Sequence, residues 1–285
     1  MFDTLRIFWE TPHAEGVLCR IEHVERETWR GRPAWRGPIG HLRVFVCPPL
    51  VSVSFEVGRI VGAREFDTAT AHRLIDFVSD EVGESVHDAS LTRVDTSANL
   101  DVTEPAEHYL GLLIYAPHLS LHREAPASVR LSNKTRALLY YDPYRKRGIE
   151  SGAHVVRVEH QVKKNVGRVL KWDRPRLATL ADPAFRALCA ERLDLAHRLV
   201  RAVPGVRRFD GVEDVRDVAA ANYFAGCPED VLRALAAVDA APLSLSRKRR
   251  QRDRILSALP RPSEPHRHPL LCELDHLVAT ATSSM

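Results

Sequence analysis

The chain has 285 residues, 45% of them hydrophobic and 27% charged, with a formal net charge of +4 at pH 7. This mixture is typical of a folded globular protein and excludes a disordered or collagen-like chain. No apolar run reaches the roughly 18–20 residues that a membrane span needs, and the first residues lack the pattern of a secretory signal. The five cysteines are scattered without CxxC spacing, so a cytoplasmic protein with reduced thiols and no membrane partner is expected.

The N-terminal part of the chain alternates apolar and polar residues in short runs. This pattern predicts strands over residues 5–9, 17–24, 42–47 and 51–57. Residues 29–40, WRGRPAWRGPIG, are rich in Gly, Pro, Trp and Arg and are interpreted as a loop. Two roles stay open for this loop. It is either a connector whose tryptophans cover the core, or an Arg/aromatic finger on which bases stack.

A helix and an informative strand come next in the chain. Apolar residues at helical spacing predict a helix over residues 69–82, capped by Asp67 or Thr68. Residues 90–102 predict a strand with one apolar face and one polar face. The polar face carries Arg93, Asp95, Ser97, Asn99 and Asp101. It is either a face turned to solvent or the acidic face of a catalytic sheet.

The middle of the chain predicts a short helix and further strands. Glu104-Pro105 is a helix start signal, and the helix is expected to run to about residue 114. Strands are predicted over residues 118–122, 127–131, 136–141 and 153–163. One face of the last strand is polar and consists of Arg157, Glu159, Gln161 and Lys163.

Beyond Trp172 the pattern becomes helical. Helices are predicted over residues 182–203, 212–226, 228–238, 244–259 and from 270 to about 279, with a proline-rich linker over 260–269. Strands followed by a run of helices predict an α+β fold. We expect two regions, one over residues 1–172 and a helical one over 173–285 that contains the basic helix 244–259.

The charge is concentrated in the centre of the sequence. Residues 129–174 contain 12 Lys and Arg against 4 Asp and Glu, a local charge of +8, whereas the whole chain carries only +4. The remainder therefore sums to −4. A basic, tyrosine-bearing segment in a mildly acidic chain suggests that a polyanion is bound here.

The two polar strand faces and the tyrosine strand together suggest a reaction. Asp95 and Glu159 are hard oxygen ligands of the kind that Mg²⁺ or Mn²⁺ prefers. A tyrosine phenol ionises near pH 10 and is a poor nucleophile at neutral pH. A divalent ion that polarises a phosphodiester, with Lys or Arg nearby, makes its attack feasible. A tyrosine DNA nickase needs these parts.

Five segments in this order resemble a known family. They are MFDTLRIFWETPH, VSVSFEVGRIVGAREF, TRVDTSANLDV, RALLYYDPYRKRG and VVRVEHQVKKNVGRVL. Together they resemble the replication initiators of filamentous phages, which belong with the rolling-circle plasmid initiators. The similarity covers about residues 1–172, and it rests on the order of all five segments rather than on any single one.

The resemblance implies an HUH-like endonuclease fold, with an antiparallel sheet and helices on one face. Such initiators nick one strand at an origin, become joined through tyrosine to the 5′ phosphate and leave a 3′ hydroxyl as primer. The match to RALLYYDPY implies Tyr141 as nucleophile, with Tyr140 next and Tyr144 third. It also implies that Asp95 and Glu159 bind the metal.

The family usually has a lysine two residues after the tyrosine, where this chain has Pro143. Lys146 or Arg145 is expected to take that role, and the neighbouring Asp142 is a further candidate metal ligand. Phosphate contacts are expected from Lys134, Arg136, Arg145, Arg157, Lys163 and Lys164, and from Arg249 and Arg250 of the basic helix. The expected partners are single- and double-stranded origin DNA, host replication proteins and a second copy of the chain.

Two other functions stay open. One is a non-catalytic origin-binding protein that has kept the basic surface but lost the chemistry, which Pro143 favours. The other is a binding module for single-stranded DNA or RNA that uses Trp29, Trp35 and the tyrosines as stacking platforms.

Overall fold

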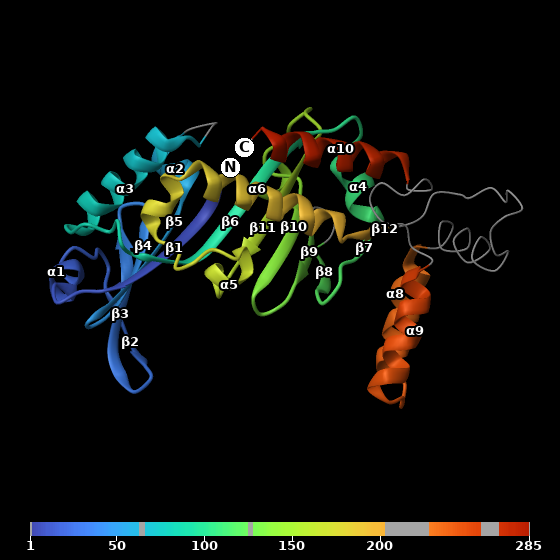
Figure 1. Ribbon diagram of the computed structural model, residues 1–285, viewed down its shortest axis with the longest axis horizontal. Coiled ribbons are helices and arrows are strands. Elements are labelled where there is room, and N and C mark those ends of the chain that lie inside the picture. The colour runs from blue at the N-terminus through green and yellow to red at the C-terminus, as the bar shows by residue number, and fades with distance from the viewer. Residues whose placement is uncertain (1, 63–65, 125–127, 203–227, 258–267, 285) are drawn as a thin grey trace, which may run out of the picture.

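The computed structural model describes residues 2–62, 66–124, 128–202, 228–257 and 268–284, and its centre is a 10-stranded sheet (Figure 1). Every pair of neighbouring strands is antiparallel, and the spatial order is β2-β3-β4-β5-β1-β6-β11-β10-β9-β8. The strands are β1 (Phe2–Glu10), β2 (Glu25–Trp29), β3 (Arg32–Ile39), β4 (Leu42–Cys47), β5 (Leu50–Glu56), β6 (Ser90–Asp101), β8 (Ser120–Glu124), β9 (Ser128–Ser132), β10 (Arg136–Tyr141) and β11 (Val155–Val162).

The helices and a small second sheet complete the fold. Strands β7 (Leu113–Tyr115) and β12 (Arg201–Ala202) form the second sheet. The helices are α1 (Ala14–Leu18), α2 (Val57–Val61), α3 (Thr68–Val82), α4 (Ala106–Leu112), α5 (Val166–Leu170), α6 (Pro183–Arg198), α8 (Pro228–Ala240), α9 (Leu245–Ser257) and α10 (Pro269–Ser283), with the 3-10 turns η1 (Arg145–Arg147) and η2 (Leu177–Ala181). None of the described helices is long and apolar enough to cross a bilayer.

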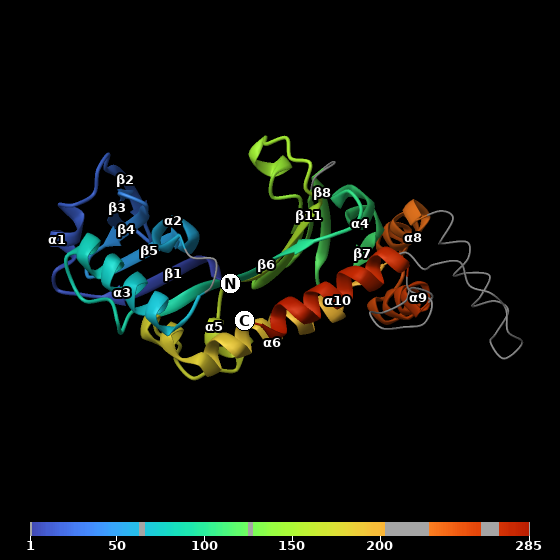
Figure 2. The same ribbon diagram turned by 90° about the horizontal axis from the view of Figure 1, so that it is seen from above.

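Helices α3, α6 and α10 lie on one side of the large sheet, and the turn between β10 and β11 rises on the other side (Figure 2). The core lies between these helices and the inward side chains of the strands. One part of it joins β1 and β5 to α3, and another joins β10 and β11 to α6 and α10. The opposite side of the sheet, which carries Asp95, Tyr141 and Glu159, is called the open face below.

Helix α3 shows how the sequence specifies this packing. It begins after Asp67, whose Oδ1 accepts a hydrogen bond of 2.7 Å from the backbone N–H of Thr70 and so caps the first turn. It ends at Gly83, which has φ 80°. Between these ends the buried residues recur at helical spacing, as predicted, and include Ala71, Leu74, Ile75, Val78 and Val82.

The C-terminal helices share the core of the sheet. Leu193 of α6 and Leu274 of α10 are buried in the same cluster as Val158 of β11. Helices α8 and α9 pair with each other, and a separate small cluster joins Val231 of α8 to Ile114 of β7. The α+β fold, with its antiparallel sheet, helices on one face and helical C-terminal region, is confirmed. A division into two domains at residue 172 stays a prediction.

The strand predicted over residues 17–24 is wrong. Residues Ala14–Leu18 form the short helix α1, and Ala14 and Val17 are buried against the first core cluster. Their spacing of three suits one helical turn. Over so few residues, the alternation of VLCRIEHV cannot be distinguished from such a turn.

The loop predicted over residues 29–40 is also wrong, because this segment is part of the hairpin β2–β3. The connection is the two-residue turn Arg30-Gly31, in which both residues have positive φ, 51° and 76°. Such a turn matches the twist of the two strands. Pro33 and Pro38 lie within β3. The proline and glycine content therefore indicated a loop, although the chain forms two paired strands here.

Several boundaries differ from the prediction. Helix α4 ends at Leu112, where β7 takes over, and α6 ends at Arg198 rather than continuing to residue 203. Strand β8 starts at Ser120. The helix predicted over residues 212–226 and the linker residues 260–267 lie outside the described residues.

Candidate active site on the open face of the sheet

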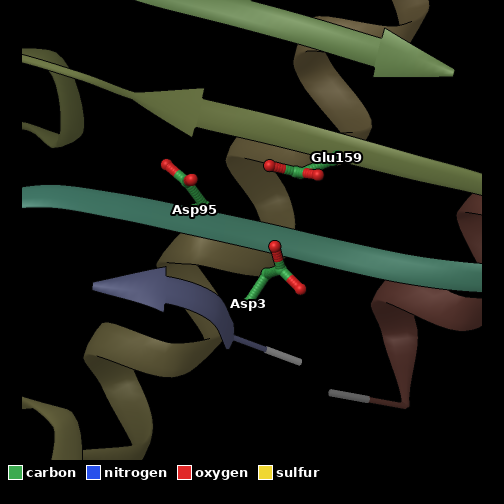
Figure 3. Close-up of side chains that lie close together, drawn as sticks. All are labelled: Asp3, Asp95 and Glu159. Atoms are coloured by element: carbon green, nitrogen blue, oxygen red, sulfur yellow. The ribbon is translucent and has the colours of Figure 1, made fainter. Parts of the chain in front are cut away.

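Three carboxylates from three neighbouring strands meet on the open face. Asp95 comes from β6, Glu159 from β11 and Asp3 from β1 (Figure 3). One oxygen from each lies within 4.8 Å of the others. Alternation explains the first two, since their neighbours Val94 and Val158 are buried on the helix side. The two acidic residues that the sequence predicted as metal ligands therefore lie together.

Asp3 is the member of this group that the sequence analysis missed. The predicted strand began at residue 5, whereas β1 begins at Phe2. The pairing of β1 with β6 is irregular between Phe2 and Leu5, and this irregularity breaks the simple alternation along β1. An acidic residue at the start of an apolar segment was the only signal, and alternation alone could not place it on this face.

Two arginines bind the carboxylates. The Nε of Arg93 donates to both oxygens of Asp95, at 2.9 and 3.0 Å. Arg157 forms an ion pair with Asp3 and donates to Ser97 Oγ at 2.8 Å and to Asn99 Oδ1 at 3.0 Å. Three carboxylates and two guanidinium groups leave one formal negative charge. The site is thus acidic, with both cations fixed beside it.

Burial and like charge act together on Asp95, whose side chain is fully buried. The pKa of Asp95 is raised to about 7, chiefly by burial and also by the nearby Glu159 and Asp3, although the hydrogen bonds and charge of Arg93 oppose the rise. A carboxylate with this pKa loses its proton readily when a cation arrives. A bound divalent ion would relieve the repulsion among the three carboxylates.

The donor set fits a hard divalent cation. Mg²⁺ and Mn²⁺ are bound by carboxylate oxygens, and three such oxygens lie close together here. Asp142, the third metal ligand predicted from the sequence, lies outside this group. Its Oδ1 accepts hydrogen bonds from the backbone N–H groups of Tyr144 and Arg145, at 2.9 and 3.1 Å, and so stabilises the turn after β10.

Tyr141 is the tyrosine that reaches the acidic group. Its hydroxyl donates to Glu159 Oε2 at 3.2 Å, and Lys146 Nζ lies 4.0 Å from the centre of its ring. Burial raises the pKa of Tyr141 above its usual range, and Glu159 raises it as well, whereas Arg157 opposes the rise. The phenol is neutral at pH 7, and its ionisation would need extra positive charge.

The other two candidate tyrosines lie elsewhere. Tyr140 points to the helix side of β10, where its hydroxyl lies 2.7 Å from Nδ1 of His197. The Nε2 of His197 in turn lies 2.8 Å from Asp275 of α10. Tyr144 lies in the exposed turn after β10. The side chains of the adjacent Tyr140 and Tyr141 thus lie on opposite faces of the sheet.

The predicted phosphate-binding residues divide into three groups. Arg157 is in the site, and Lys163 lies nearby, with its Nζ donating to the backbone oxygen of Asn133 at 2.6 Å. Arg136 faces the helix side, near His160. The remaining residues, Lys134, Arg145, Lys164, Arg249 and Arg250, are exposed. The last two belong to α9, which lies far from the strands β1, β6 and β11 (Figure 1).

Gln161 and Arg130 extend the site toward β9 and were not predicted as site residues. The Nε2 of Gln161 donates to Glu159 Oε1 at 2.6 Å, and Arg130 donates to Gln161 Oε1 at 3.4 Å. Glu159 therefore accepts one hydrogen bond on each oxygen, from Gln161 and from Tyr141. Both donors fix the orientation of its carboxylate.

No protein-family model matches the sequence, and no curated protein matches it either. Among solved structures, the chain is similar to a rolling circle replication initiator protein from Geobacillus stearothermophilus, with a TM-score of 0.41 and 10% sequence identity. The alignment covers 76% of this chain and 89% of that chain. At this TM-score and identity the similarity decides neither fold nor function, so the functional argument rests on the site.

Proposed function

We propose that this protein is a metal-dependent, tyrosine-nucleophile DNA endonuclease that initiates rolling-circle replication, as in the filamentous-phage initiators that its sequence resembles. One observation carries the proposal. Three carboxylates from separate strands converge within 4.8 Å, and the hydroxyl of Tyr141 donates to one of them. Tyr141 is the proposed nucleophile, and Asp3, Asp95 and Glu159 are the proposed metal ligands.

The reaction would join Tyr141 to the 5′ phosphate at the nick. The Tyr141 oxygen forms a bond to phosphorus while the bond from phosphorus to the 3′ oxygen breaks, and the leaving 3′ oxygen takes a proton from solvent. Glu159 accepts the hydrogen bond of the phenol and is placed to take its proton. A divalent ion at the three carboxylates would polarise the phosphodiester. The freed 3′ hydroxyl serves as primer.

Two cations beside Tyr141 are placed to act on phosphate. Arg157 opposes the rise in the pKa of Tyr141, so it favours the phenolate. Its Nε is buried, and no described residue accepts its hydrogen, so a phosphate oxygen would satisfy this donor. Lys146 lies over the Tyr141 ring and belongs to the 3-10 turn η1 that follows β10. It is the proposed substitute for the lysine that the family has two residues after the tyrosine.

The test uses single-stranded DNA of randomised sequence with Mn²⁺ and two labelling schemes. If tyrosine takes the 5′ phosphate, a 3′ label moves onto the protein and a 5′ label leaves on a fragment with a free 3′ hydroxyl. The expected adduct needs Mn²⁺, disappears in Tyr141→Phe and persists in Tyr140→Phe. An adduct that survives Tyr141→Phe but not Tyr144→Phe would move the nucleophile to the exposed turn.

Absence of any adduct, with this library and with origin DNA, would refute the endonuclease. Salt-dependent DNA binding without cleavage would then favour the non-catalytic origin-binding protein, the function that Pro143 favours.

A further inference from the structure

The pairing of β1, β5 and β4 places polar residues in rows across the open face. Arg6 of β1 is paired with Arg93 of β6 on one side and with Ser54 of β5 on the other, and Ser54 is paired with Arg43 of β4. Paired residues of a sheet share a face, so this row begins beside Asp95, the partner of Arg93. Arg6 and Arg43 are both exposed.

A second row runs parallel to the first and carries aromatic rings. Phe8 of β1 is paired with Ser52 of β5, Ser52 with Phe45 of β4, and Phe45 with Arg36 of β3. Phe8 and Phe45 are half-buried rather than buried in the core. Their neighbours on the other side of the strands, such as Val44 and Val46, fill the core instead.

The aromatic row continues into the hairpin β2–β3. The rings of Trp29 and Phe45 meet edge to face, with centroids 6.0 Å apart. The guanidinium of Arg30, at the tip of the hairpin, lies 4.6 Å from the centre of the Trp29 ring. The segment interpreted as a loop from the sequence therefore forms the far end of this row.

Positive charge exceeds negative charge along these rows. Arg6 is exposed overall but partly desolvated by its neighbours, and this desolvation, with the guanidinium groups of Arg93 and Arg36, lowers its pKa, whereas Asp95 opposes the shift. Arg36 pairs with Glu27 at 2.9 Å and Arg93 pairs with Asp95, so two of these arginines have acidic partners. A polyanion is the ligand that would relieve this repulsion.

We propose that the open face of β1, β5 and β4, from the acidic group to the β2–β3 hairpin, binds a segment of single-stranded DNA, with phosphates on Arg6 and Arg43 and bases on Phe8, Phe45 and Trp29. This inference rests on the proposed function, since it names the path of the DNA beside the nick. Exposed arginines interleaved with half-buried aromatic rings are the chemistry of a surface that stacks single-stranded bases. This surface, called the track below, runs from the acidic group to the β2–β3 hairpin. Five strand-to-strand steps from β6 to β2 give it a length of about 24 Å.

The experiment measures binding rather than cleavage, so that it is independent of the nuclease. A fluorescent oligothymidylate of about 12 nucleotides, within the range that such surfaces hold, is titrated with full-length protein in EDTA at several salt concentrations. The double variant Arg6→Gln/Arg43→Gln removes two cations from the track. The variant Arg198→Gln/Arg233→Gln removes two exposed arginines from α6 and α8, away from the open face, and is its charge-matched control.

The double variant on the track is expected to bind about tenfold more weakly, and its slope of log K against log salt should fall by about 1.4, because each lost phosphate contact on a single strand contributes about 0.7. The control should match the wild type. Phe45→Leu, which keeps an apolar side chain in place, should weaken binding by about 5- to 100-fold through lost stacking.

Equal weakening in both double variants, or no effect of Phe45→Leu on a folded protein, would overturn the track. So would a blunt-ended duplex that competes as well as the single strand. Loss of nicking in Tyr141→Phe with binding unchanged leaves the track standing, and a wild type that binds but never nicks refutes only the proposed nuclease.

Discussion

Tyr140 and Tyr141 are consecutive residues with opposite surroundings, and replacing each by phenylalanine separates stability from chemistry. Tyr140 is fully buried, and its hydroxyl lies 2.7 Å from Nδ1 of His197, which is itself 1% exposed. Tyr140→Phe leaves that buried ring nitrogen without its tyrosine partner. Because a buried polar atom that loses its partner costs about 1–3 kcal/mol, the free energy of unfolding should fall by that amount.

The loss should be visible as a shift in melting temperature. For chains somewhat smaller than this one, 1 kcal/mol corresponds to about 2–4 °C, so Tm should fall by roughly 2–12 °C. His197 also holds Asp275 of α10 at 2.8 Å, so the docking of that helix should loosen too. Hydrogen exchange in α10 would report this loosening separately from global unfolding.

Tyr141→Phe is the matched control. Its hydroxyl donates at 3.2 Å to Glu159, which keeps its 2.6 Å hydrogen bond from Gln161 after the substitution. We expect a smaller loss of stability than in Tyr140→Phe, because the lost hydrogen bond is longer, 3.2 Å against 2.7 Å, and complete loss of the covalent DNA adduct. Equal losses of stability in the two variants would refute this assignment of roles. So would an adduct that depends on Tyr140 rather than Tyr141.

Three further outcomes follow from the same geometry. In Asp3→Asn, Mn²⁺ should no longer raise Tm, whereas millimolar Mn²⁺ should raise the Tm of the wild type; a variant that responds like the wild type would remove Asp3 from the metal site. Burial, with Arg136 and Arg192, lowers the pKa of His160 to about 4 in the folded chain. In the unfolded chain this histidine binds its proton near pH 6.5, so between these two pH values only the unfolded chain is protonated at His160. Stability is therefore fully present above pH 6.5 and falls as the pH drops toward 4, by about 2 kcal/mol at pH 5, and urea unfolding of His160→Leu should lack this share of the pH dependence. In α9, Arg249→Gln/Arg250→Gln should reduce the salt slope of duplex binding by about 1.8 without changing adduct formation on single strands, and an unchanged slope would show that α9 does not contact DNA.

Alternation along the strands made most of the central sheet predictable. Strands β6 and β11 were predicted with the correct polar faces, because both are long and one side of each is apolar. The same alternation places Tyr140 and Tyr141 on opposite faces of β10. It could not show that the two polar faces lie side by side on the open side of one sheet, because the other side is covered by α6 and α10, which follow much later in the chain.

Two features of the site needed the folded chain. Asp3 joins the acidic group through an irregular pairing at the start of β1, and no sequence pattern locates such an irregularity. The basic hairpin β2–β3 was interpreted as a loop because its glycine and prolines suggested irregular structure. In the fold, Arg30-Gly31 supplies a tight turn, and each proline lies where β3 is paired on one side only, Pro33 with β2 and Pro38 with β4, so that a missing N–H is tolerated.

The two faces of β10 and β11 have different roles, since the helix side contributes to stability and the open side carries the candidate site. On the helix side, Val158 and Tyr140 pack against α6 and α10, and any change there acts first on stability. On the open side, Glu159 and Tyr141 are strand residues whose positions follow from that packing, and the Tyr141 hydroxyl donates to Glu159. Burial beside carboxylates disfavours ionisation of the Tyr141 phenol. The strand β10 nevertheless keeps the phenol in this position. Cleavage should therefore depend on cation binding at Asp3, Asp95 and Glu159 far more than folding does, because Asp95 and Asp3 already have Arg93 and Arg157 as partners and Glu159 accepts hydrogen bonds from Gln161 and Tyr141.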